Sequence, residues 1–210
     1  MPAQVEAVFG RNITLVYDTL DPNIVDRNQL RTIIPGTAPA IMDMPDMIVA
    51  VYQPLPLLVQ IGDRRIRINH AVEIPDLGDF PIWEYARRYF DLLGGTKAAL
   101  IAYGYNFDFG IILSEMTIED LMINKFVQNR TQLEQTLQGE LISFLPRITF
   151  KSGAAQYDIV FEPFQDSRVK VHGNVHLQED GIQLPDEEGL RVSFTESYER
   201  VRTVILDLLN

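Results

Sequence analysis

The chain has 210 residues, of which 46% are hydrophobic, 10% aromatic and 22% charged, a composition that excludes disordered and fibrous classes. It contains no cysteine, which excludes disulfides, thiolate zinc sites, iron–sulfur clusters and cysteine nucleophiles. With 18 Lys+Arg against 29 Asp+Glu the formal net charge is −11, which argues against nucleic acid and anionic membranes as partners.

The sequence shows no targeting or membrane-spanning segment. Its first residues form neither the basic segment nor the long apolar segment of a secretory signal. The apolar run Val201–Leu209 contains Arg202 and Asp207, and no run reaches the roughly 18 residues that a membrane span needs. We therefore expect a cytoplasmic protein with no membrane partner.

The first 95 residues have the pattern of a strand, a short helix, three strands and a second helix. β-Branched and aromatic residues predict a strand over Val5–Tyr17, with a break or bulge at Gly10. Asp21-Pro22 is typical of a helix N-terminus. The remaining predicted elements are strands at Met47–Tyr52, Leu57–Ile61 and Arg65–Ile74, a hairpin turn at Gly62-Asp63, and a helix from Pro81 to Gly94-Gly95.

Residues 96–210 repeat this order with longer connections. A capping box at Ser193-Phe-Thr-Glu196 predicts the start of the last helix. The elements before it are a strand at Ala98–Leu113, helices opening at Thr117 and at Gln132, and strands at Leu141–Phe150, Tyr157–Phe164 and Arg168–Leu177.

The two halves also match residue by residue. Shifting the sequence by 94 residues aligns Val5–Ile13 with Ala99–Phe107, so that Gly10 meets Gly104 and Asn12 meets Asn106. We predict an internal duplication in which residues 1–95 and residues 96–210 are two β-α-β-β-β-α units packed as one compact domain. Strands joined by short turns pair antiparallel, so the predicted fold class is α+β, with two related sheets side by side and helices on one face.

An aromatic strand near the start of the second half is the first candidate for a binding site. Alternation from residue 103 to residue 110 places Tyr105 on one face and Asn106 and Asp108 on the other. One interpretation is a sheet floor on which Asn106 and Asp108 bind the polar groups of a ligand. The other is a central strand whose aromatic face packs under helices.

Two arginines that share a strand face are the second candidate. Arg65 and Arg67, with Arg87-Arg88, could form a cationic patch for a carboxylate, a phosphate or an acidic partner. An edge strand guarded by charges explains the same residues.

No metal, cofactor or catalytic motif is present in the sequence. His172 and His176 lie in an alternating segment, where an extended strand separates them by about 13 Å, too far for one metal. Phosphate-binding loops, dinucleotide fingerprints, nucleophile elbows and zinc-protease motifs are all missing. We therefore expect no metal site and no cofactor.

The leading hypothesis is a non-enzymatic protein-binding or assembly module that acts through a sheet surface, with a protein partner or a second copy of the chain as ligand. The alternative is a small-ligand-binding protein or enzyme with a site between sheet and helices. That site would use Tyr105, Asn106 and Asp108 with Arg65 or Arg67. Nucleic acid ranks last among the partners, because neither half of the chain is basic.

Overall fold

The computed structural model describes residues 3–94, 98–113, 116–165 and 167–210. These residues form an α+β fold built on one antiparallel sheet of nine strands, in the order β2-β3-β4-β5-β1-β6-β9-β8-β7. The α+β class and the antiparallel pairing are as predicted. The expectation of two sheets side by side is wrong, because β1 and β6 pair directly along most of their length and join both groups of strands.

The first group of strands comprises β1 (Gln4–Tyr17), β2 (Ala40–Met44), β3 (Met47–Tyr52), β4 (Leu57–Gly62) and β5 (Arg65–His70). With it come a single 3-10 turn, η1 (Pro22–Ile24), and the helices α1 (Arg27–Thr32) and α2 (Ile82–Leu92). The second group comprises β6 (Leu100–Ile112), β7 (Arg147–Ser152), β8 (Ala155–Gln165) and β9 (Arg168–Leu177). Its helices are α3 (Ile118–Phe126), α4 (Arg130–Leu137) and α5 (Glu187–Leu209).

Most predicted strands are present, and the bulge in the first strand is confirmed by a register shift between Val8 and Gly10. The short strand β2 was missed because its alternating pattern is weak and its side chains are mostly exposed. The last helix starts at Glu187, earlier than predicted, because Asp186 caps it by accepting a hydrogen bond from the Gly189 N–H. Gly95, the expected boundary between the halves, lies outside the described residues.

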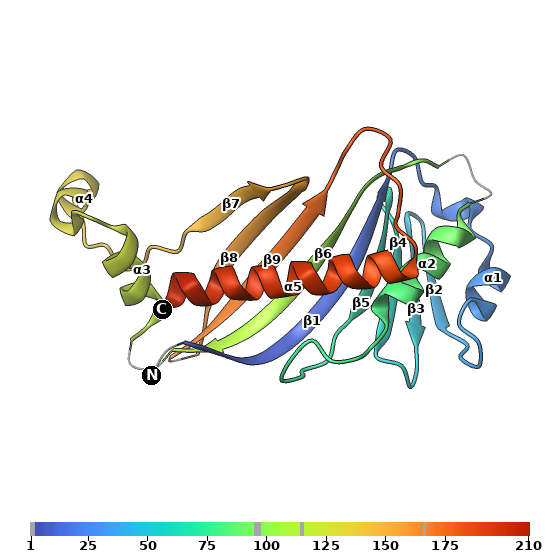
Figure 1. Cartoon of the computed structure of the whole chain (residues 1–210), viewed down its shortest axis with the longest axis horizontal. Coiled ribbons are helices and arrows are strands. Elements are labelled where there is room, and N and C mark those ends of the chain that lie inside the picture. The colour runs from blue at the N-terminus through green and yellow to red at the C-terminus, as the bar shows by residue number, and fades with distance from the viewer. Residues whose placement is uncertain (1–2, 95–97, 114–115, 166) are drawn as a thin grey trace.

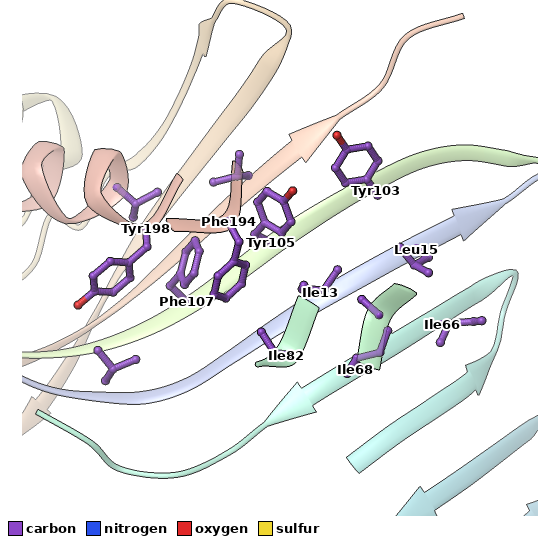
Figure 2. Close-up of a cluster of buried hydrophobic side chains, with 14 of the residues drawn as sticks. Ile13, Leu15, Ile66, Ile68, Ile82, Tyr103, Tyr105, Phe107, Phe194 and Tyr198 are labelled. Carbon is purple, nitrogen blue, oxygen red and sulfur yellow. The ribbon is translucent and has the colours of Figure 1, made fainter. Parts of the chain in front are cut away.

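Two helices pack on one face of the sheet (Figure 1). α5 runs across β8, β9 and β6 and meets α2, which packs on β1 and β5. Aromatic and β-branched side chains from the strands fill the space beneath them, and Figure 2 shows this cluster. The aromatic face of β6 is therefore the core of the protein. α3 and α4 lie beyond the C-terminal end of α5, where Lys125 Nζ donates to the Leu208 carbonyl over 3.0 Å.

A glycine sets how closely α5 approaches the sheet. A Cβ added at Gly173 of β9 would lie 2.3 Å from Cγ1 of Val201, so the helix contacts the strand backbone directly. No helix of the described residues is long and apolar enough to cross a membrane.

Candidate functional site: the open face of the sheet

The face of the sheet opposite α2 and α5, here called the open face, carries polar side chains. Along β1, β5, β6 and β9 buried residues alternate with partly exposed ones, since successive strand residues point to opposite faces. The partly or fully exposed residues include four asparagines, two arginines of β5 and two histidines of β9, together with Thr14, Asp108 and Lys170. An antiparallel sheet covered by helices on one face commonly leaves the other to solvent, so the open face is the candidate binding surface.

Four asparagines form a row across the centre of the open face, here called the amide row. Asn69, Asn12, Asn106 and Asn174 lie directly opposite one another on β5, β1, β6 and β9. The Asn174 Nδ2 donates to Asn106 Oδ1 over 2.5 Å, and the Asn106 Nδ2 donates to Asn12 Oδ1 over 2.7 Å. Asn69 Nδ2 donates to the backbone carbonyls of Leu58 and Arg67.

The hydrogen bonds of the amide row all run in one direction. Asn12 Oδ1 accepts from Asn106 and also from Thr14 Oγ1 over 3.1 Å. Asn12 Nδ2 has no hydrogen-bond partner among the described residues, so the chain of hydrogen bonds ends in a donor on β1, on the side that faces β5. Hydrogen bonds in a chain polarise one another, which strengthens the donor at the end of the row.

Arg65 and Arg67 lie beside this donor. They face the same way on β5, opposite Val16 and Thr14 of β1. Neither forms an ion pair with any described residue. β5 pairs with β4 on one side and β1 on the other, so the edge-strand interpretation of these arginines is wrong.

The other predicted members of the cationic patch lie elsewhere. Arg87 and Arg88 are on α2, on the helix-covered side of the sheet. Arg87 pairs with Asp91 over 2.9 Å, and its Nη1 donates to the Leu184 carbonyl. The patch on the open face is therefore limited to the arginines of β5.

A hollow of about 430 Å³ lies over the arginines and the amide row. Gly104 forms part of its floor, between Thr14 on β1 and His176 on β9. A Cβ at Gly104 would lie 2.4 Å from the Val175 carbonyl oxygen, so this position is restricted to glycine. The absence of a side chain there leaves room between the arginines and His176.

Asp108 is on the open face but is engaged by a neighbouring strand. Its Oδ1 contacts Nδ1 of His172 on β9, and His172 Nε2 lies 3.3 Å from Glu162 on β8. The imidazole is thus held between two carboxylates, one row away from the asparagines. Within the described residues no group of histidine and acidic side chains is arranged to hold a metal ion.

Tyr105 is separated from the other predicted site residues. Its side chain is buried on the helix side (Figure 2). There the hydroxyl donates to Ser193 Oγ over 3.0 Å. Burial raises the pKa of this phenol well above its ordinary value. The structure therefore brings together Asn106, Arg65 and Arg67, leaves Asp108 beside them, and places Tyr105 in the core.

Sequence reasoning missed the partners of Asn106. Asn69, Asn174 and His176 were not singled out for the site, although the alternation of Val and polar residues in 168–177 places the last two on one face. Asn12 enters the sequence prediction only as the residue that matches Asn106 in the proposed repeat. The signal that would have found the row is the pairing register, which joins residues from four separate strands.

A scan of protein-family models found no match to the chain, and a search of curated proteins found none either. On the open face, hydrogen-bond donors and cations thus lie over β5 and β1, and the imidazole of β9 lies between a carboxylate of β6 and one of β8.

Proposed function

We propose that the chain is a non-enzymatic binding module that contacts a protein partner through the open face of its sheet. The observation that carries this proposal is the amide row beside two unpaired arginines on an interior strand. Amide groups neither titrate nor attack substrates, but they supply directional hydrogen bonds at fixed positions. Held on a rigid sheet, such groups are suited to recognition.

The proposed duplication is supported by the strand order. On each side of the central β1–β6 pair, three strands follow in decreasing sequence order: β5, β4 and β3 beside β1, and β9, β8 and β7 beside β6. β2 is added at the outer edge, beside β3. Asn12 and Asn106, which match in the predicted repeat, face each other at the centre. On this proposal residues 1–95 and 96–210 each contribute half of the binding face.

A second candidate function is the binding of a small polar ligand. The hollow of about 430 Å³ favours it, since it is within the size range of ligand pockets. The ligand would contact Asn106, Arg65 and Arg67 on the open face. It would not lie between sheet and helices, where aromatic side chains fill the core.

The test is affinity capture with a variant of each face. Asn106→Trp fills the centre of the open face, and Glu196→Trp adds the same side chain at an exposed position on α5. We expect wild type and Glu196→Trp to capture the same partner from a lysate of source cells, and Asn106→Trp to lose it while keeping the wild-type circular dichroism. Capture of an identical partner by all three proteins would contradict the proposal.

A further inference from the structure

We infer that Arg65 and Arg67 form an anion-binding subsite of the open face, and that its ligand is an extended acidic segment of the partner with carboxylates at alternating positions. This inference rests on the proposed function and specifies the chemistry of the partner. It is carried by the position of the arginines, the donors around them and the repeat distance of an extended chain.

The position of the arginines is not explained by the needs of the fold. β5 is an interior strand, so it has no free edge for charged residues to protect. The chain has 29 acidic residues, yet Arg65 and Arg67 pair with none of the described ones. Asp46 and Asp63 line an adjoining hollow with both arginines without forming an ion pair. Two cations in an acidic protein are thus left available to an external anion.

The groups around the arginines also favour negative charge. The chain of hydrogen bonds within the amide row ends in the Asn12 Nδ2 donor, and the hollow brings this residue together with both arginines. Guanidinium groups bind carboxylates through paired, charge-assisted hydrogen bonds. The nearby carboxylates of Asp108 and Glu162 face His172, one row away on β6, β9 and β8. Over the hollow with the amide row, the arginines and the Asn12 donor therefore face a ligand, while the carboxylates of Asp46 and Asp63 lie in the adjoining hollow.

The spacing of the arginines selects the form of the ligand. Residues two apart in a strand point to the same face about 6.6 Å apart, and an extended ligand repeats at the same distance. Carboxylates at alternating positions of an extended segment can therefore meet Arg65 and Arg67 together. Adjacent carboxylates point to opposite sides of such a segment, and only one of them would reach the sheet. Asn69 is the next residue of β5 on the same face, and Asn12 lies directly opposite it on β1, so the adjoining part of the segment meets these two amides.

The experiment uses two synthetic peptides of equal composition and charge, one with the order Gly-Glu-Ser-Glu-Ser-Gly and one with Gly-Ser-Glu-Glu-Ser-Gly. Binding to the full chain is measured by isothermal titration and by amide chemical shifts, at about 50 mM salt so that screening is modest. We expect the alternating peptide to bind at least about threefold more tightly than the adjacent one. Shift changes should concentrate on β5 and β1.

Matched variants locate the site. Arg65→Gln/Arg67→Gln should weaken binding of the alternating peptide by about tenfold or more, because both charge-assisted contacts are lost. Arg200→Gln removes an exposed arginine of α5, on the other side of the sheet, and should leave binding unchanged. Equal loss in both proteins, or shift changes away from β5 and β1, would overturn the inference.

Two further arms separate this inference from its alternatives. Inorganic phosphate that binds as tightly as the alternating peptide, with the same dependence on both arginines, would overturn the assignment to a peptide. The partner captured by wild type is then tested against the double variant. Retention by Arg65→Gln/Arg67→Gln with loss by Asn106→Trp would overturn the acidic subsite and leave the proposed function standing. Retention by both variants would refute the proposed function itself.

Discussion

His70 connects the stability of this protein to pH. Its side chain is buried on β5 opposite Arg11 of β1, and its ring stacks on Phe80 at a centroid distance of 3.9 Å. Its Nδ1 atom has no hydrogen-bond partner in the part of the chain that the structure describes. Burial, with a smaller contribution from the charge of Arg11, lowers the pKa of His70 from 6.5 to about 4. The folded protein therefore keeps this imidazole neutral under conditions in which the unfolded chain is protonated.

The sign of the effect follows from proton binding. As the pH falls from 6.5 toward 4, the unfolded chain binds a proton at His70 that the folded protein does not, so the free energy of unfolding decreases. Below pH 4 both states are protonated and the loss levels off. His70→Phe keeps a ring against Phe80 and removes the titration. The linkage predicts that this variant gains about 1 kcal/mol on wild type at pH 5.5 and about 2–3 kcal/mol at pH 4.5, relative to their difference at pH 7.5.

Urea denaturation at a series of pH values measures this difference. Trp83, on α2 and 6.2 Å from the ring of Phe194, provides a fluorescence signal from the core. Ile68→Val changes a buried side chain of the same strand as His70 that does not titrate, and it should alter the stability by the same amount at every pH. A stability difference between wild type and His70→Phe that is constant from pH 7.5 to pH 4.5 would refute the reasoning.

Three other substitutions test the packing described above. Gly173→Ala places a Cβ 2.3 Å from Cγ1 of Val201 and should cost about 1–3 kcal/mol in thermal denaturation, with part of the loss restored by Val201→Ala. Arg11 is 3% exposed, and its Nε and Nη1 atoms have no hydrogen-bond partner among the described residues. Arg11→Met removes this buried guanidinium, and we expect the free energy of unfolding at pH 7 to rise by about 1–3 kcal/mol; a loss of stability would contradict this. Tyr105→Phe should cost about 1 kcal/mol, because the hydrogen bond to Ser193 is lost, and should leave peptide binding on the open face unchanged by titration.

The sequence predicts the elements of the fold better than their arrangement. Alternation of apolar and polar residues locates β1, β6 and β9 because each has one face in the core. The sequence does not predict β2, because nearly all of its residues are exposed and the alternation of apolar and polar residues is therefore absent. The N-terminus of α5 was misplaced because Ser193 and Glu196 resemble a capping box, whereas Ser193 lies inside the helix and accepts a hydrogen bond from Tyr105. The presence of Ser193 is thus explained by its tertiary contact with Tyr105, whereas the local sequence pattern assigns it to a helix cap.

The candidate site was only partly predictable for a related reason. Arg65 and Arg67 could be placed on one face from their spacing, but whether their strand is an edge or an interior strand depends on which strands flank it. Charged residues have different roles in the two positions. On an edge they prevent pairing with other chains, and on an interior strand they face a ligand or solvent. Only the strand order distinguishes these cases, and no local pattern specifies it.

The centre of the amide row links the proposed duplication to the proposed site. In an antiparallel pair the residue numbers of the two strands run in opposite directions. Within the continuous register of β1 and β6, a single position can therefore face its own equivalent at an offset of 94 residues, and that position is Asn12 facing Asn106. If the halves are copies, any polar residue at this position meets itself across the strand pair. Asparagine suits such a place because its amide both donates and accepts, so two identical side chains can hydrogen-bond to each other. A charged residue there would face a like charge and destabilise the pair.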